Sequence, residues 1–254
     1  MLMNAERRQQ IAQFIRQRKR ATVAELSEQF GVSEATIRRD LEHLDSAGVI
    51  RRTHGGAIAV ERATPEPPVV LRMAECQEEK ARIGRAAADL IRDGETIFLG
   101  SGTTTLEVAR NLSHKKGLTV ITNALNIAQQ LAGQEHITVI VAGGLLRHSE
   151  LSMIGHLTEQ MLRELRADKV IMGMRAISIE DGLTNDYLPE TMTDRAIIQF
   201  APEVILVADH TKFGKVATAF VAPVTAVHKI VTDDKAPRPL VAELQRMGIE
   251  VIVA

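Results

Sequence analysis

Two stretches of the sequence combine residue types that suit the binding of an anion. Residues 100–106 read GSGTTTL and directly follow the apolar run at 96–99. Glycines let backbone amides approach an anion, threonine hydroxyls donate hydrogen bonds, and the N-terminus of a following helix carries a partial positive charge. Residues 209–214 read DHTKFG, follow another apolar run and add a lysine. Phosphate fits this chemistry, so the candidate ligands are Gly102, Thr103, Thr104, Thr105, Asp209 and Lys212.

Each of these stretches also has a purely structural interpretation. A Gly/Thr turn often serves only to begin a helix, and a lysine at the end of a strand is usually just solvated. Three further groups follow apolar runs in the same way and could converge with them on one pocket: the pair Thr122 and Asn123, the pair Gly143 and Gly144, and Arg147.

The elements that must position these residues alternate regularly. Short apolar, β-branched runs occur at 96–99, 118–122, 137–142, 170–172, 204–208, 229–232 and 250–253. Helix-length segments accompany them at 78–91, 104–112, 124–131, 157–165, 191–200 and 239–247. Strands that are apolar throughout and alternate with helices are typical of a mostly parallel sheet covered on both faces. This part of the chain is therefore predicted to be α/β, with ligands at the carboxyl ends of its strands.

Residues 33–44 (SEATIRRDLEHL) predict a helix of a different kind, near the N-terminus. Three apolar residues recur at i, i+4 and i+7 and form one face: Ile37, Leu41 and Leu44. A packed helix that turns arginines and small polar groups outward fits the major groove of DNA. The candidate DNA contacts, with the capping serine included, are Ser33, Thr36, Arg38 and Arg39.

Segments on both sides of this helix complete a winged helix-turn-helix. Upstream, Thr22 and Glu25 have the spacing of a capping box, and Gly31 ends the helix that they begin. Downstream, residues 49–60 form two extended halves around a Gly-Gly pair, with three more candidate DNA contacts near the tip: Arg51, Arg52 and His54. The alternative is a small helical domain whose arginines face solvent, but the three linked features favour DNA binding.

At this point the sequence resembles a known family. The strings TIRRDL at 36–41 and HGGA at 54–57, with Leu44 and Gly48 between them, resemble the winged helix-turn-helix of the DeoR family of bacterial transcription regulators. From about residue 79 onward, the GTTT loop, the Thr-Asn and Gly-Gly pairs and the DHTKFG string resemble the effector domain of that family. That domain is similar in fold to sugar-phosphate isomerases of the ribose-5-phosphate isomerase type.

The resemblance implies a phosphorylated sugar as the effector, held by residues 102–105 and Lys212. One departure bears on the ligand. Many members of the family have Asp where Gly100 stands here, and such an acid would meet sugar hydroxyls. The identity of the effector is therefore left open.

Three segments make up the predicted organisation. Residues 1–60 form the winged helix-turn-helix domain, residues 61–74 a linker with Pro65, Pro67 and Pro68, and residues 75–254 the α/β effector domain. Residues 1–60 carry ten Lys/Arg and seven Asp/Glu, a net charge of +3, whereas the remainder carries 21 and 25, a net charge of -4. A basic module on an acidic body is expected if only the first part contacts phosphates.

Composition excludes several other classes of protein. With 45% hydrophobic and 25% charged residues the chain reads as globular, and no apolar run approaches the length of a membrane span. The N-terminus has no apolar signal core, which predicts a cytoplasmic protein. Cys76 is the single cysteine, and the histidines show no metal-ligand spacing, so we expect no disulfide, metal or cofactor.

The competing function is catalysis on the same architecture. An aldose–ketose isomerase needs a carboxylate base, yet residues 173–179 contain none where the isomerases carry an acidic cluster. Glu180 and Asp181 resemble a surface turn, and Asp186 and Glu190 flank Pro189 in an apparent loop. The sequence therefore predicts a regulator that represses a sugar-metabolism operon, binds operator DNA as a homodimer or homotetramer, and is released by a phosphorylated sugar. The alternative is a sugar-phosphate isomerase-type enzyme with an accessory DNA-binding domain.

Overall fold

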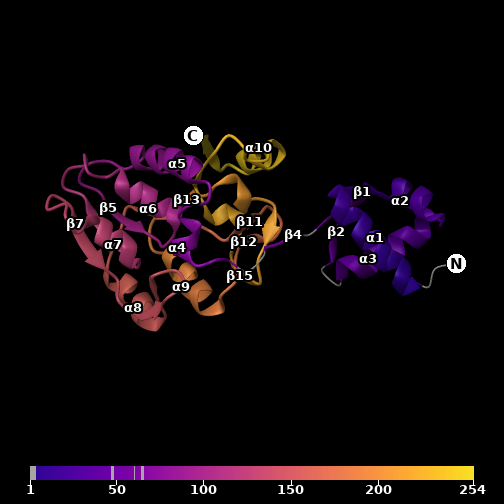
Figure 1. The fold of residues 1–254 in the computed structure, drawn as a ribbon, viewed down its shortest axis with the longest axis horizontal. Coiled ribbons are helices and arrows are strands. Elements are labelled where there is room, and N and C mark those ends of the chain that lie inside the picture. The colour runs from indigo at the N-terminus through magenta and orange to yellow at the C-terminus, as the bar shows by residue number, and fades with distance from the viewer. Residues whose placement is uncertain (1–3, 47–48, 60, 64–65) are drawn as a thin grey trace. The chain divides into compact units, whose positions relative to one another are not determined.

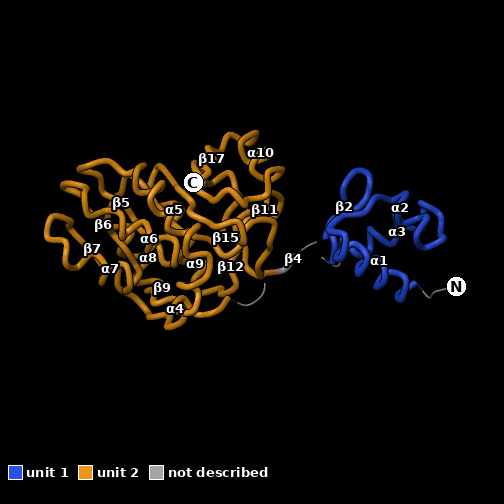
Figure 2. The backbone as a smooth tube through the Cα atoms, turned by 45° about the horizontal axis from the view of Figure 1, so that its top comes forward, with its two compact units in different colours: residues 1–62 blue, residues 63–254 orange. Residues whose placement is uncertain are grey.

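The computed structural model describes residues 4–46, 49–59, 61–63 and 66–254. The chain divides into two compact units, residues 1–62 and residues 63–254, which Figure 2 distinguishes by colour. Gly48, Val60 and Pro65, which belong to the predicted family motif, wing and linker, lie outside the described residues.

The described residues of the first unit form three helices and a small antiparallel sheet in the order β1-β3-β2. Its elements are α1 (Asn4–Arg18), β1 (Arg20–Thr22), α2 (Val23–Phe30), α3 (Glu34–Ser46), β2 (Ile50–Thr53), β3 (Gly56–Ala59) and β4 (Glu61–Arg62). The predicted local signals are present. Thr22 and Glu25 form a complete capping box at α2, and Gly31 ends that helix in the left-handed conformation, with φ of 62°. This is the predicted winged helix-turn-helix.

A buried ion cluster joins the first and third helices of this unit. Asp40 of α3 is 2% exposed and accepts hydrogen bonds from Nε of Arg7, at 2.7 Å, and Nε of Arg8, at 2.9 Å. Apolar contacts complete the core, whose largest fully buried members are Ile11, Ile15, Leu26, Ile37, Leu41 and Ile50. Burial therefore fixes one face of α3 and leaves the other face to solvent.

The second unit is built on a seven-stranded sheet in the order β17-β16-β13-β10-β5-β6-β7. Every pair of neighbouring strands is parallel. The strands are β5 (Thr96–Leu99), β6 (Thr119–Thr122), β7 (Thr138–Val141), β10 (Lys169–Met172), β13 (Glu203–Val207), β16 (Lys229–Thr232) and β17 (Glu250–Val253). Each of them falls on a predicted apolar run, so the prediction of a parallel α/β sheet is confirmed.

Helices cover both faces of this sheet (Figure 1). Successive strand residues point to opposite faces, so Ile97 and Leu99 pack on one side and Phe98 on the other. The first side is covered by α5 (Gln77–Asp89), α6 (Thr103–Arg110) and α7 (Leu125–Leu131). The second is covered by α8 (His156–Glu164), α9 (Leu188–Ile198) and α10 (Arg238–Arg246), together with a small antiparallel sheet.

Shorter elements that the periodicity of the sequence did not predict complete the unit. They are α4 (Val69–Arg72), the hairpin β8 (Leu145–Arg147) with β9 (Ser152–Ile154), the sheet of β11 (Ala176–Ser178), β12 (Gly182–Asn185) and β15 (Ala219–Ala222), and β14 (Lys215–Val216). Two 3-10 turns lie at His210–Lys212 and Val224–Ala226. Most of these elements lie between the carboxyl end of one sheet strand and the next helix or strand.

The order of the strands sets where a ligand can bind. From β5 the chain runs outward through β6 to β7, and then returns to place β10 on the other side of β5. The crevice outside the carboxyl ends of β5 and β10 is therefore the topological switch point, where open α/β sheets bind their ligands.

Candidate functional site

The outward face of α3 is the first candidate site. Ser33 caps the helix, because its Oγ accepts from the amide of Thr36 at 3.3 Å and its carbonyl accepts from the amide of Ile37 at 3.0 Å. Arg38 pairs with Glu34 at 2.9 Å, one turn back on the helix. Arg39 is exposed, and within the described part of the chain no ion pair of its guanidinium is recorded. The helix thus presents the exposed guanidinium of Arg39 to solvent, where it can contact DNA.

The wing lies beside this helix in the sheet formed by β2 and β3. Arg52 contacts α3 twice, since its Nη1 pairs with Glu42 at 2.8 Å and its amide donates to Oδ1 of Asp45 at 3.0 Å. His54 and Gly55 form the exposed turn between the strands, and Arg51 is half-buried. These bonds hold the basic wing at a fixed position against the helix.

The second candidate site is a cavity at the topological switch point. It is lined by the loop after β5, at Gly100–Thr105, by residues 173–175 after β10, and by Ala208 and Lys212 after β13. The predicted residues Gly102, Thr103, Thr104, Thr105 and Lys212 therefore come together. Gly100, whose identity departs from the common family pattern, also lines the cavity.

The Gly/Thr loop is built to present backbone donors. Gly102 stands at the N-cap position of α6 with φ of 138°, a conformation that residues with a Cβ rarely adopt. Thr105 holds the loop closed, because its Oγ1 donates to the carbonyl of Gly102 at 3.0 Å. The first amides of a helix lack acceptors within the helix, so this terminus can bind an anion.

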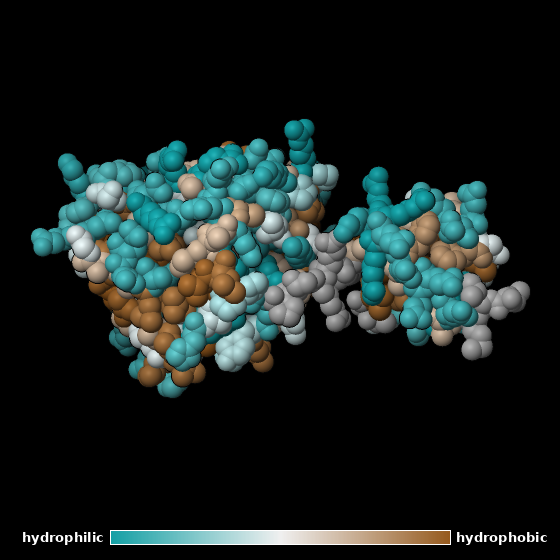
Figure 3. All heavy atoms as spheres, in the orientation of Figure 1, coloured by the Kyte–Doolittle hydropathy of each residue, from teal (hydrophilic) through white to brown (hydrophobic). Residues whose placement is uncertain are grey.

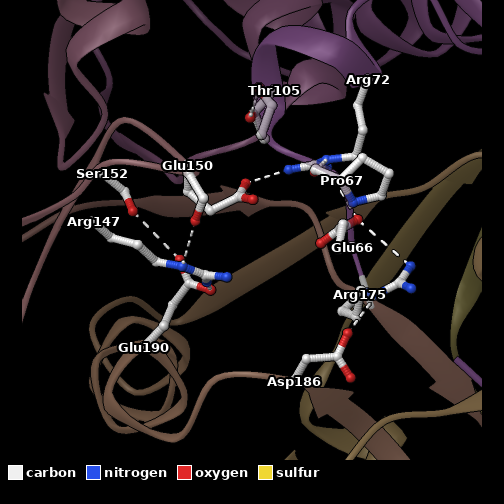
Figure 4. A network of polar contacts seen from close by, with 12 residues as sticks. Glu66, Pro67, Arg72, Thr105, Arg147, Glu150, Ser152, Arg175, Asp186 and Glu190 are labelled. Carbon is white, nitrogen blue, oxygen red and sulfur yellow. Dashed lines mark hydrogen bonds and ion pairs between the residues drawn. The ribbon is translucent and has the colours of Figure 1, made fainter. Parts of the chain in front are cut away.

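Three cations surround one carboxylate in the same cavity, and Figure 4 shows two of them, Arg72 and Arg175, beside Glu66. Oε1 of Glu66 lies 2.7 Å from Nζ of Lys212, 3.1 Å from Nη1 of Arg72 and 3.6 Å from Nη1 of Arg175. Burial alone would raise the pKa of Glu66, but Lys212 and Arg72 outweigh that effect and the pKa is lowered. The carboxylate is therefore charged and in tight contact with positive groups.

The opposite part of the cavity is rich in carboxylates. Glu150 pairs with Arg72, and Glu190 pairs with Arg147 (Figure 4). The guanidinium carbon of Arg147 also lies over the ring of Tyr187, 4.8 Å from its centroid. Burial raises the pKa of Glu150, although Arg72 partly opposes this. Asp194, next to Glu190, has a pKa raised well above its ordinary value by burial and by the charge of Glu190.

The other predicted ligands do not line this cavity. Thr122 donates to the carbonyl of Leu99, and Nδ2 of Asn123 donates to the carbonyl of Met153. Thr122 ends β6 and Asn123 follows it, and the Gly143 and Gly144 pair follows β7, so both groups lie away from the switch point. Gly143 accepts from Thr158, and a Cβ on Gly144 would clash with the same threonine.

Two charged candidates have structural partners instead. Asp209 is 2% exposed and caps the turn before Lys212, where its Oδ1 accepts from the amide and the hydroxyl of Thr211. Arg147 reaches the cavity only through Glu190. Asp209 and Arg147 therefore position residues that line the cavity, but they do not line it themselves.

Several lining residues were not predicted from the sequence as ligands: Glu66, Arg72, Glu150, Arg175, Asn185 and Asp194, together with Glu190, which was considered only as a catalytic carboxylate. Two of them come from residues 61–74, the expected linker. Val69 donates to the carbonyl of Ser149 at 2.7 Å, which anchors that segment to the second unit. Glu190 lies within α9 and not in a loop, because Pro189 occupies the first turn of the helix, where a proline is tolerated.

Of the carboxylates considered for catalysis, Glu190 lines the cavity and is paired with Arg147, whereas the other three have different surroundings. Glu180 and Asp181 occupy the turn between β11 and β12, as predicted, and Asp186 pairs with Arg175 at 2.8 Å. Among the described residues no group of three His, Cys, Asp or Glu side chains could hold a metal ion. None of the described helices is both long and apolar enough to cross a lipid bilayer.

A winged helix-turn-helix followed by an α/β unit with a polar cavity at its switch point defines a DNA-binding regulator with a ligand-sensing domain. Family models identify both parts: residues 7–63 match the DeoR-like helix-turn-helix domain, and residues 75–234 match the DeoR C terminal sensor domain. The chain belongs to the DeoR family of transcriptional regulators. The predicted family and the prediction of a regulator, in preference to an isomerase, are confirmed.

Its relatives include named repressors. The chain is 37% identical to the transcriptional repressor AccR of Agrobacterium fabrum, over 90% of this chain and 89% of that one. It is 36% identical to the glycerol-3-phosphate regulon repressor of Escherichia coli, over 94% of each chain. A solved structure of ribose 5-phosphate isomerase A from Methanocaldococcus jannaschii is similar in fold, with a TM-score of 0.40 and 17% identity over 54% of each chain.

Proposed function

We propose that this protein represses a sugar-metabolism operon by binding its operator DNA, and that a phosphorylated sugar releases it. The observation that carries the proposal is the pairing of two sites in one chain, an exposed arginine-bearing helix with a basic wing and a polar cavity with a Gly/Thr loop. Named repressors among the relatives support the repressing role. A protein with this function would be located in the cytoplasm, together with its operator DNA.

In this proposal α3 reads the operator and the wing contacts its backbone. Arg38, Arg39 and Thr36 would meet base edges or phosphates in the major groove, while Arg51, Arg52 and His54 would contact the flanking phosphates. The exposure of Arg39 supports a role as a base-reading group. Ser33 would act mainly by capping the helix that carries these side chains.

The effector site in this proposal is the cavity beside β5 and β10. The phosphate would be held by the amides and hydroxyls of residues 102–105, with Lys212 as a counter-charge. To switch the regulator, the effector must favour one of two states by a few kcal/mol, on the order of the shift that reverses a two-state population.

We further propose that the protein acts as a homodimer or homotetramer. Palindromic operators match the symmetry of such oligomers, and one winged helix buries little DNA. Figure 3 shows an apolar area on the face of the second unit that lies over α7 and α8. Exposed apolar side chains of this unit, which support self-association, include Val141, Leu145, Leu157, Leu188 and Met192.

The test is fluorescence anisotropy of the purified chain on DNA from its own upstream region, at a stated salt concentration. A panel of phosphorylated sugars is then added at increasing concentration. Tight binding that one phosphorylated sugar reverses is the expected result. Specific binding that no phosphorylated compound reverses would contradict the effector class, and turnover of a sugar phosphate by the same preparation would contradict the assignment as a regulator.

A further inference from the structure

One carboxylate of the chain occupies the most positive place in the effector cavity. Side chains of Glu66, Lys212, Arg72 and Arg175 are only 13%, 16%, 9% and 8% exposed. All three recorded ion pairs of Glu66 use the same oxygen, Oε1. A single oxygen therefore serves as the common counter-ion of three buried cations, as an oxygen of a bound anion would.

The ion pairs of the neighbouring residues make Glu66 replaceable. Arg72 also pairs with Glu150, and Arg175 also pairs with Asp186. Both arginines therefore keep a carboxylate when Glu66 moves away. Lys212 is different, since Glu66 is the one partner recorded for its ammonium group among the described residues. If the Glu66 side chain moves away, the ammonium group of Lys212 loses its carboxylate and favours the binding of another anion, because a buried charge without a partner costs free energy.

The backbone around Glu66 is held at points that do not depend on its side chain. The amide of Ala63 donates to the carbonyl of Val216 at 2.9 Å, and the amide of Val69 donates to the carbonyl of Ser149 at 2.7 Å. Nε of Arg72 donates to the carbonyl of Pro67 at 2.9 Å. The side chain of Glu66 can thus exchange with a ligand while the segment keeps these attachments.

We propose that Lys212, Arg72 and Arg175 form a second anion subsite, in which the carboxylate of Glu66 stands in for an anionic group of the effector. The effector is then a sugar phosphate that carries a second anionic group, a carboxylate in the first place. Its phosphate binds the Gly/Thr loop and its second anion displaces Glu66. This inference rests on the proposed function, because it names the class of sugar phosphate that the cavity takes.

The residue at position 100 agrees with such a ligand. Gly100 lines the same cavity as the three cations. A carboxylate at this position would repel a second anion nearby, whereas it would suit the hydroxyls of a neutral sugar. Glycine at this position adds no further carboxylate to the cavity.

The first experiment needs no knowledge of the natural effector. Malonate binding to the full chain is measured by isothermal titration calorimetry for the wild type and the variants Glu66→Gln, Glu66→Gln with Lys212→Met, and Glu95→Gln. In Glu66→Gln the tethered competitor is neutral, so we expect malonate to bind about tenfold more tightly or better, which corresponds to one strong charge contact. The added Lys212→Met change should remove this gain.

Glu95 is the matched control for net charge. It pairs with Lys169 and does not line the effector cavity. Glu95→Gln therefore changes the charge of the chain by the same amount and should leave malonate affinity as in the wild type. If Glu66→Gln binds malonate no more tightly than Glu95→Gln does, the second anion subsite is wrong.

The second experiment tests the ligand class by operator release. It compares 6-phosphogluconate with glucitol 6-phosphate, which differ only at C1, where the first has a carboxylate and the second a hydroxymethyl group. Glucitol 1,6-bisphosphate is included as a compound whose second anionic group is a phosphate, and the four- and five-carbon homologues of each compound are tested as well. A preference of about tenfold or more for a compound that carries a second anionic group besides its phosphate supports the proposal, and the better of the two such compounds identifies that group. Equal release by the glucitol phosphate overturns it.

The two levels of the proposal fail differently. If no phosphorylated sugar releases the operator, the proposed function is contradicted, while the malonate experiment still decides whether the subsite exists. If sugar phosphates release the operator with no preference for a second anion, the proposed function stands and this inference falls.

Discussion

Asp194 lies one helical turn after Glu190 on α9, and the two carboxylates share one donor. Nδ2 of Asn185 donates to Oε2 of Glu190 at 3.0 Å and to Oδ2 of Asp194 at 2.8 Å. Glu190 also has Arg147 as a counter-charge, which leaves the pair with one charge compensated by a cation. Burial and the charge of Glu190 raise the pKa of Asp194 well above its ordinary value, so its carboxyl group binds a proton more tightly than it does in the unfolded chain.

The raised pKa of Asp194 predicts a stability that depends on pH. Folding raises the proton affinity of Asp194, so its protonation stabilises the folded state. This contribution is fully present below the pKa of Asp194 in the unfolded chain, near 3.8, and is lost as the pH rises through its pKa in the folded protein. Asp194→Asn keeps the shape and cannot ionise. We expect the variant to unfold at a higher temperature than the wild type at neutral pH, with the difference vanishing below pH 4.

Thermal unfolding followed by circular dichroism over this pH range checks the prediction. Asp89→Asn is the control, because Asp89 is an exposed carboxylate at the end of α5. A difference between Asp194→Asn and the wild type that persists unchanged at low pH would show that the raised pKa is not its cause.

The strands of the seven-stranded sheet and the longer helices were predictable because their signals are local. The apolar run at 96–99 and the GTTT string that follows it give the strand, the loop and the helix in one continuous stretch. Glu66 and Glu150 could not be recognised in this way. Each is an ordinary charged residue in a short irregular region, and it becomes part of the cavity through a contact with Lys212 or Arg72, far away in the sequence.

The strand order decided which predicted ligands meet. Thr122 and Thr105 both lie at or just after the carboxyl end of an apolar run in the sequence, and both were predicted as ligands of one pocket. Only Thr105 lies beside the switch point, because β10 returns to the side of β5 that is opposite to β6. That return is a property of the whole sheet, and the local pattern of the sequence does not predict it.

Arg39→Ala is predicted to weaken specific operator binding strongly. Loss of one base-reading arginine removes about 1–3 kcal/mol of discrimination, which weakens specific binding roughly five- to a hundredfold. Because Arg39 is exposed and outside the effector cavity, effector affinity should be unchanged. Anisotropy on operator and on unrelated DNA measures the first effect, and calorimetry the second. A variant that loses the effector as well would contradict the division of roles between the two units.

Arg39→Lys sharpens this test. Lysine keeps the charge but lacks the planar fork that binds guanine through two hydrogen bonds. If Arg39 reads a base, Lys should restore binding to unrelated DNA but not to the operator. Full recovery on the operator would instead indicate that Arg39 contacts a phosphate.

Asp40→Ala should unfold the first unit selectively. It leaves Arg7, which is 8% exposed, without its buried counter-charge, and breaking a buried pair in this way costs about 3–5 kcal/mol. Hydrogen exchange should show lost protection across α1 and α3 and unchanged protection in the seven-stranded sheet. Glu34→Ala removes an exposed pair from the same helix and should cost about 1 kcal/mol or less. Similar effects of the two variants would mean that the buried cluster does not hold α1 to α3.

Gly102→Ala tests the Gly/Thr loop itself. At Gly102 φ is 138°, and a Cβ would lie 3.2 Å from Oγ1 of Thr105, which closes the loop. Alanine therefore either strains the backbone, at about 1–3 kcal/mol, or moves the amides that would hold the phosphate. We expect effector affinity to fall roughly five- to a hundredfold with operator affinity retained.

Gly133→Ala is the matched control, since no atom lies within 4 Å of the added Cβ. Because operator release requires that the effector bind, Gly102→Ala should act as a repressor that is difficult to induce. Normal release by this variant would place the phosphate elsewhere in the cavity.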